Sequence, residues 1–259
     1  MNRVTSRDGT SIAFERAGQG PAVVIVGGVL GDRSQQAPLA ALLAEHFTVH
    51  NYDRRGHGES GFTEPHSEER EFEDLEAILD AAGGSAFVYA TSGCAIESLY
   101  AAASGLGSRM RKLALWEPPF ILDGSRPRPE RYPERLRALL AEGRRGDVVE
   151  LFMVDAVGMP RELVEQMRQA PWWPAQEAAA HTLVNDAIVI GDFSFPTERV
   201  ATVTTPTLVI DGGTTPWLTD AADAVASTLP NARRHTIAGQ PHNVDHEALA
   251  PVLISFFGS

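Results

Sequence analysis

The feature that most constrains the fold is the stretch 85–103, in which a β-type run passes directly into a helical pattern. Residues 86–90 are apolar and aromatic, which is typical of a strand buried on both faces. From Cys94 onward, apolar residues recur at helical spacing. A strand that becomes a helix within three residues gives the residue at the turn a strained or positive φ and leaves its side chain exposed. The residue at this turn is Ser92.

Such a turn brings the strand and helix backbones close together, so small residues are needed two places before and two places after it. Ala90 and Cys94 meet this need. The sequence Ala-Thr-Ser-Gly-Cys is a degenerate form of the G-x-S-x-G nucleophile elbow, with both outer glycines replaced. An ordinary serine cap at a strand–helix junction is the alternative, and these five residues alone leave both interpretations open.

Composition and charge exclude several classes of protein. The chain has 259 residues, 43% of them hydrophobic, which suits a globular core. Its net charge is −12, with 22 basic and 34 acidic residues and no long basic cluster, so we expect neither nucleic-acid nor membrane partners. One cysteine excludes an internal disulfide, and the first ten residues lack an apolar signal segment. We expect a cytoplasmic protein, monomeric or homodimeric, with a small-molecule substrate.

The remaining pattern predicts an α/β fold. Residues 4–17 carry two short β-type runs around Asp8-Gly9, a strong hairpin signal. A continuous apolar run follows at 22–26 and indicates a parallel strand covered on both faces, and further strands are expected at 47–52, 111–116 and 205–210. Helical patterns at 39–46, 68–82, 220–229 and 246–257 lie between or after them, and residues 233–237 form a last strand. We therefore predict a mostly parallel central sheet of about eight strands with helices on both faces.

Between residues 121 and 195 the composition shifts to prolines followed by helical segments at 134–141, 147–157, 161–169 and 175–185. We interpret this segment as a helical cap inserted into a core formed by residues 1–120 and 196–259. Within it, Trp172 and Trp173 lie between two prolines. They are predicted either to line an apolar substrate cleft or to belong to the core of the cap.

Four motifs occur together in one order along the chain. They are the turn Gly27-Gly28-Val29, the loop Tyr52-Asp-Arg-Arg-Gly-His-Gly-Glu-Ser60, the elbow at Ser92 and a late histidine. In this set the chain resembles the α/β-hydrolase superfamily, in its cap-bearing branch, and the resemblance spans nearly the whole sequence. Two positions depart from the family pattern: Gly27-Gly28 stands where the family usually has His-Gly, and Cys94 where it has Gly or Ala. In the loop, adjacent Asp53 and Arg54 predict a tight turn braced by a buried ion pair.

A serine nucleophile needs a general base, an orienting carboxylate and two donors for the oxyanion. His242 follows the last strand in a Gly/Pro-bounded loop, where the resemblance places the base; a surface loop histidine is the alternative. Gly93, directly after Ser92, offers one backbone N–H by position. The resemblance implies that Val29, after the glycine turn, offers the other.

The identity of the acid is less clear. The resemblance most often places it a few residues beyond strand 208–210, and this register falls on Thr215, which carries no charge. Asp211 is nearby but lies almost within the strand, and a turn-forming role would also explain it. Glu117 ends the strand that follows the elbow strand, a location that the haloalkane dehalogenase branch uses. We therefore predict Glu117 as the acid, with a structural carboxylate as the alternative.

Together these residues favour a cofactor-free serine hydrolase that cleaves a small or medium ester, lactone or thioester. A lyase or cyclase on the same scaffold, or a binding protein that has lost catalysis, remains open because of the altered elbow and Thr215. Cys94 is expected to be a small buried hydrophobe rather than a nucleophile. No spacing of histidines and cysteines indicates a metal site.

Overall fold

The computed structural model describes residues 1–259 and contains one eight-stranded sheet in the order β1-β2-β4-β3-β5-β6-β7-β8. The first two strands form an antiparallel hairpin, β2 pairs antiparallel with β4, and all later pairs are parallel. This confirms the predicted fold class. The strands are β1 (Asn2–Thr5), β2 (Ser11–Ala17), β3 (Ala22–Val26), β4 (Thr48–Tyr52), β5 (Ala86–Thr91), β6 (Met110–Trp116), β7 (Thr207–Gly213) and β8 (Ala232–Gln240).

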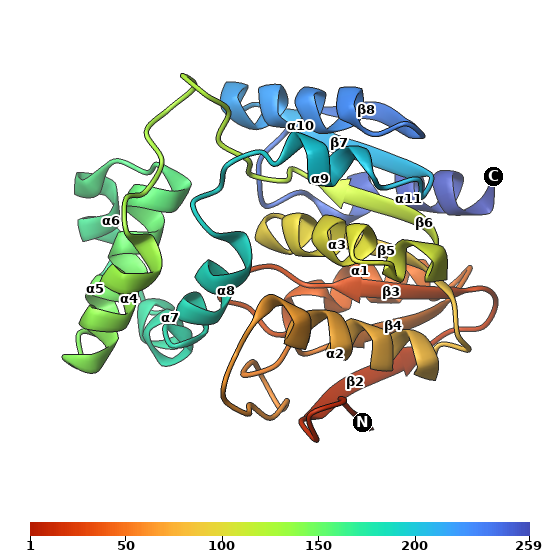
Figure 1. Ribbon diagram of the computed structural model, residues 1–259, viewed down its shortest axis with the longest axis horizontal. Helices are drawn as coiled ribbons and strands as arrows, with labels where there is room; N and C mark the ends of the chain where they lie inside the picture. The colour runs from red at the N-terminus through yellow and green to blue at the C-terminus, as the bar shows by residue number, and fades with distance from the viewer.

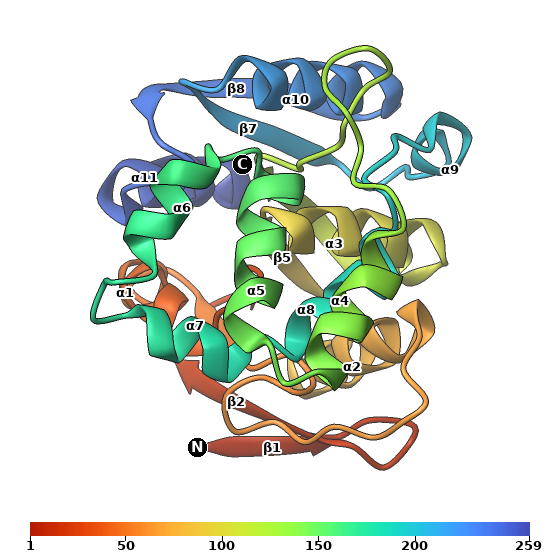
Figure 2. The ribbon, with the colours of Figure 1, turned by 90° about the vertical axis from the view of Figure 1, so that its left-hand side faces the viewer.

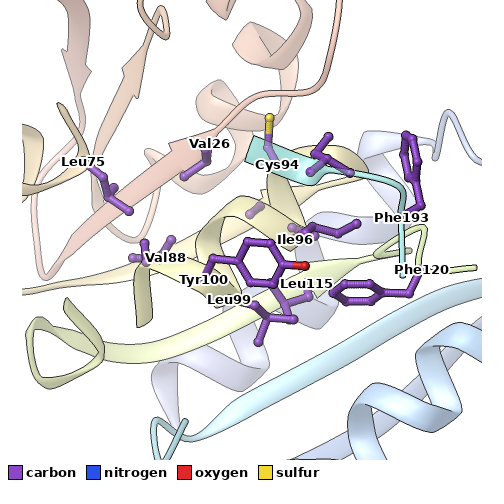
Figure 3. Packing of buried hydrophobic residues seen from close by; sticks show 14 of the residues in the cluster. Val26, Leu75, Val88, Cys94, Ile96, Leu99, Tyr100, Leu115, Phe120 and Phe193 are labelled. Carbon is purple, nitrogen blue, oxygen red and sulfur yellow. The ribbon is translucent and has the colours of Figure 1, made fainter. Parts of the chain in front are cut away.

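The central strands are apolar on both faces because each face packs against helices. Successive side chains of a strand point to opposite sides, and in β5 Val88 and Ala90 join one hydrophobic cluster while Phe87 and Tyr89 join the other. The larger cluster includes residues of α2, α3 and α10, and the smaller one residues of α1 and α11. Figure 3 shows part of the larger cluster, where side chains of α3 pack beside Val88.

The covering helices lie on both faces of the sheet, as predicted, although α1 and α10 begin two and four residues earlier than expected. Figure 1 shows α2, α3 and α10 in front of the sheet and α1 and α11 behind it. The bounds of these helices are α1 (Ala37–Leu43), α2 (Glu68–Ala81), α3 (Gly93–Ala103), α10 (Pro216–Thr228) and α11 (His246–Gly258). Short 3-10 turns precede α1 and β6, at Arg33–Gln36 and Leu106–Arg109. None of the helices combines the length and the apolar character that a membrane span requires.

The segment 121–195 lies beyond the carboxyl ends of the parallel strands (Figures 1 and 2). Its helices are α4 (Tyr132–Ala141), α5 (Arg145–Leu151), α6 (Arg161–Met167), α7 (Trp173–Ala179) and α8 (Thr182–Ile190), and α5 continues through a π-helical turn at Phe152–Val157. The single helix predicted at 175–185 is in fact two helices, α7 and α8. A further short helix, α9 (Thr197–Ala201), was not predicted. The division into core and cap stays a prediction.

The loop after β4 is held by buried ion pairs, but not by the one predicted between Asp53 and Arg54. Asp53 instead binds Arg33. Arg54 binds Glu97 at 3.1 Å and also Asp186. Consecutive residues of an extended segment point in opposite directions, so adjacent Asp53 and Arg54 find partners on different elements.

Candidate active site

Ser92 lies at the sharp turn between β5 and α3. Its φ is 56° and its ψ −134°, a conformation that L-residues rarely adopt. The backbone N–H of Ser92 donates to the Trp116 carbonyl at 2.8 Å. The hydrogen bonding between β5 and β6 therefore continues as far as Ser92, the residue at the turn. This is the strained strand-to-helix geometry predicted from the sequence, and it leaves Ser92 only partly buried.

Glu117 lies one strand away in a similar position. Its backbone N–H donates to the Ile210 carbonyl at 2.9 Å, and its φ is 43°. The side chain is 1% exposed. Strain at a buried acidic residue next to the elbow is typical of a functional site, where the surrounding structure holds the unfavourable conformation.

His242 follows β8, which extends to Gln240 rather than ending at the predicted residue 237. The loop that carries it is fixed to the sheet, because the indole Nε1 of Trp116 donates to the His242 carbonyl at 2.8 Å. Asp245 then caps α11, because its carboxylate accepts a bond from the Glu247 N–H at 2.9 Å.

These three side chains form one hydrogen-bonded chain. His242 Nε2 is 3.0 Å from Ser92 Oγ, and His242 Nδ1 is 2.6 Å from Glu117 Oε2. The other carboxylate oxygen, Glu117 Oε1, accepts a bond from the Gly212 N–H at 3.0 Å. Both carboxylate oxygens of Glu117 are thus held by hydrogen bonds. This fixes the imidazole ring of His242 with its second nitrogen toward the Ser92 hydroxyl.

Asp211, the other candidate acid, has different partners. It accepts bonds from Arg234 at 2.9 Å and from the Thr219 hydroxyl at 2.6 Å. Burial alone would raise its pKa, but the bonds from Arg234 and Thr219 outweigh burial and lower the pKa to about 2. Thr215, at the position most used in the family, is the N-terminal flanking residue of α10. No hydrogen bond joins Asp211 or Thr215 to His242.

Val29 and Gly93 both line a cavity next to Ser92. Gly93 is the first residue of α3, so its N–H has no partner within the helix. The Val29 N–H makes no hydrogen bond to the protein. A Cβ atom on Gly93 would lie 2.7 Å from the Ile190 side chain and 2.8 Å from the Val29 side chain, so a larger residue would displace these groups at the cavity.

The cavity beside Ser92 is small, about 30 Å³, and mostly apolar. Core residues form one side and the segment 121–195 forms the other. Its lining residues are Val29, Ser92, Gly93, Pro119, Tyr132, Phe152, Ala156, Val157, Asp186, Ala187, Ile190 and Phe193.

The two tryptophans predicted as candidates for the cleft are not part of this lining. Trp173 is 3% exposed and belongs to the hydrophobic core, and its Nε1 donates to Glu177 at 2.8 Å. Trp172 is 45% exposed and packs beside Trp173. The prediction that this pair lines the cleft is corrected: the aromatic residues of the cavity are Tyr132, Phe152 and Phe193.

A buried charged cluster lies next to the cavity, and no sequence pattern indicated its composition. Arg54, Glu71, Glu97 and Asp186 are each less than 5% exposed, so three carboxylates surround one guanidinium. Burial raises the pKa of Glu71 well above its usual range and that of Glu97 to about 7. The only signal for Asp186 was an acidic residue within the apolar helix at 182–190.

Two alternatives, a cysteine nucleophile and a metal site, find little support in the structure. Cys94 is 1% exposed, and burial raises the pKa of its thiol well above the usual value, which leaves it protonated and unreactive. No group of three or more His, Cys, Asp and Glu side chains is arranged to hold a metal ion.

Comparison with known proteins places this chain in a family. The family model for the alpha/beta hydrolase family matches residues 23–252, and the chain belongs to that family. An alpha/beta hydrolase from Sphaerobacter thermophilus is 56% identical, with a TM-score of 0.93, over 99% of this chain and 100% of that one.

More distant structures share the fold. A thermophilic esterase from Thermogutta terrifontis is 21% identical with a TM-score of 0.76, over 98% of this chain and 97% of its own. The enol-lactonase from Burkholderia xenovorans is 21% identical with a TM-score of 0.72, over the full length of both chains.

Proposed function

We propose that this hydrolase is a serine hydrolase that cleaves a small or medium ester, lactone or thioester through an acyl-enzyme. The observation that carries the proposal is the continuous hydrogen-bonded chain from Ser92 through His242 to Glu117. The family assignment supports hydrolysis, and the same fold is found in an esterase and in an enol-lactonase. In this proposal, residues 121–195 act as a cap that closes one side of the cavity.

In the first half-reaction, His242 Nε2 removes the proton from Ser92 Oγ as the oxygen attacks the substrate carbonyl. The positive charge that develops on the imidazole is offset by Glu117, which also holds the proton on Nδ1. The N–H groups of Val29 and Gly93 stabilise the oxyanion. His242 then donates its proton to the departing alcohol or thiol, and an acyl group remains on Ser92.

In the second half-reaction, water attacks the acyl-enzyme with His242 again acting as the base, and the acid is released. Each step transfers protons between Ser92, His242, water and substrate only, so the mechanism needs no cofactor. The cap and the apolar lining limit the size of the acyl group that can be accommodated.

The test is covalent labelling followed by turnover. A fluorophosphonate probe should label the wild-type protein at Ser92, with loss of labelling in Ser92→Ala, and p-nitrophenyl acetate should be hydrolysed. Ser92→Ala should lower kcat by several orders of magnitude with little change in Tm, as removal of a triad nucleophile does. Hydrolysis within tenfold of wild type in that variant contradicts the assignment. Labelling without hydrolysis of any ester would instead favour a lyase or cyclase, and absence of labelling a binding protein.

A further inference from the structure

Two apolar side chains narrow the cavity beside Ser92, and they meet above the backbone of Gly93. A Cβ atom on Gly93 would lie 2.7 Å from Ile190 Cδ1 and 2.8 Å from Val29 Cγ2, so both carbons stand over the residue that follows Ser92. Val29 belongs to the core, and Ile190 is the last residue of α8 in the segment 121–195. An acyl chain that extends from a carbonyl carbon at Ser92 into the cavity therefore meets Ile190 within its first few carbons.

The chain that follows Ile190 is buried and strained, and its contacts hold this wall of the cavity in place. Gly191 ends α8 with a φ of 69°, and Phe193 has a φ of 64°, which is rare for a residue with a large side chain. The Phe193 carbonyl accepts a bond from the Ile121 N–H at 2.7 Å. The Phe193 ring is 4% exposed, and its centroid lies 5.9 Å from that of Tyr132. Strain of this kind persists only where the surrounding structure enforces it, so we expect a rigid wall.

The volume and polarity of the cavity fit a short apolar chain. About 30 Å³ holds roughly two water-sized groups, which leaves room for one or two carbon atoms beyond a carbonyl group. The only charged side chain in the lining is Asp186. Its Oδ1 is bound by the Arg54 guanidinium and its Oδ2 is buried, so it presents little charge to the cavity.

The position of the base shows which part of an ester occupies the cavity. In the proposed mechanism His242 donates a proton to the departing oxygen, which must therefore lie within hydrogen-bond reach of the imidazole. His242 does not line the cavity, and its side chain is 37% exposed. The alcohol group therefore points toward solvent beside His242, and the acyl chain enters the cavity.

We propose that Ile190 determines the acyl-chain length, so that the site accepts acetyl and propionyl esters, rejects longer acyl chains and leaves the size of the alcohol almost unrestricted. Ile190 has this role because its Cδ1 atom occupies the space that the next carbon of the chain would need. The inference rests on the proposed serine-hydrolase function and names the substrate class of that same site.

The first test compares p-nitrophenyl acetate, propionate, butyrate and hexanoate, which share one leaving group. Each kcat/KM is divided by the rate constant of alkaline hydrolysis of the same ester, which removes differences in intrinsic reactivity. The corrected value for butyrate should fall at least about tenfold below that for propionate, as one methylene too many in a tight pocket costs. Ethyl acetate and hexyl acetate, followed by pH-stat titration, should differ by less than about tenfold.

The variants remove atoms from the wall of the cavity. Ile190→Val deletes only Cδ1 and should raise the butyrate-to-propionate ratio by about tenfold, and Ile190→Ala should raise the hexanoate-to-propionate ratio by at least as much. Neither should change the ratio of hexyl acetate to ethyl acetate. The matched control is Ile78→Val, which deletes the same atom from a buried residue of α2 outside the cavity and should keep all ratios. If Ile190→Ala fails to fold, Ile190→Val decides alone.

Corrected rates that do not fall from propionate to hexanoate, or a butyrate-to-propionate ratio unchanged in Ile190→Val, would overturn the inference. A fall in the alcohol series alone would overturn it as well. Ligand-observed NMR on Ser92→Ala, with and without Ile190→Val, separates these outcomes from failure of the proposed function, because it measures binding of ethyl propionate and ethyl butyrate without turnover. If the wild type hydrolyses no ester, a gain in relative butyrate binding on Ile190→Val supports the length limit, and an unchanged ratio overturns it.

Discussion

The carboxyl ends of β6 and β7 lie side by side, and a buried carboxylate stands at each, yet only one reaches the base. Glu117 is 1% exposed and Asp211 is 0% exposed. Glu117 turns away from its strand with a φ of 43° and contacts His242, whereas Asp211 stays within β7 and binds Arg234 and Thr219. Burial and position at a strand end therefore do not identify the catalytic acid. The hydrogen-bond partners of the carboxylate oxygens distinguish Glu117 from Asp211.

The largest effect is expected from Glu117→Gln. The amide can no longer offset the positive charge on His242 or hold its tautomer, and kcat should fall by about 10⁴-fold, as it does in the best-studied triad. Steady-state kinetics with p-nitrophenyl acetate measures this. A loss below about tenfold would show that Glu117 is only a structural carboxylate.

A smaller loss of kcat is expected from Gly212→Ala, which alters the residue whose N–H binds Glu117. A Cβ atom there would lie 1.8 Å from the Gln240 carbonyl oxygen, so the ends of β7 and β8 must separate. This moves the N–H that binds Glu117 and the loop that carries His242, and a shift of about 1 Å can lower kcat by about 10²-fold. Gly258→Ala, where a Cβ meets nothing within 4 Å, is the control and should leave kcat and Tm unchanged.

Asp211→Asn should lower kcat by less than tenfold, because this carboxylate does not contact His242. Its effect should appear in stability at low pH. The pKa of Asp211 is about 2 in the folded protein, below the usual 3.8, so its stabilising contribution is complete above pH 4 and is lost as the pH falls toward 2. Between pH 4 and pH 2, the Tm of the wild type should fall more steeply than that of the variant. Parallel Tm curves would contradict this account.

The last effect is expected in the Arg54 cluster, where three carboxylates surround one guanidinium. Burial raises the folded pKa of Glu97 from the usual 4.5 to about 7, so its contribution to stability is complete below pH 4.5 and is lost as the pH rises through 7. Glu97→Gln keeps an acceptor for Arg54 and removes the titration. Its Tm should change less than that of the wild type between pH 5 and pH 8, and an identical change in both proteins would contradict the prediction.

The fold and the proposed triad could be predicted because their signals are local. The run 86–90 ending at Ser92 indicates both a buried strand and a sharp turn, and Glu117 and His242 each stand just after a strand. The position that the family most often uses for the acid is the uncharged Thr215, which favoured Glu117 instead. Glu117 is the carboxylate that contacts His242 in the structure.

The Arg54 cluster could not be predicted, because its contacts join distant parts of the chain. Asp186 binds Arg54 across 132 positions, and no spacing or composition signals such a pair. The tryptophan pair was ambiguous for a different reason: neighbouring prolines do not show which side of a helix faces a cavity. Trp173 entered the core, and smaller aromatic residues line the cavity instead.

The hydrogen bonds of the site also bear on the order of events during folding. Ser92 and His242 are 150 positions apart, and Glu117 and His242 are 125 apart. Contacts at such separations form only after large loops have closed, and here also after β7 and β8 have joined the sheet. During refolding, burial of the apolar core should therefore precede recovery of catalysis. A chain whose last two strands are detached can present the elbow serine but has no base beside it.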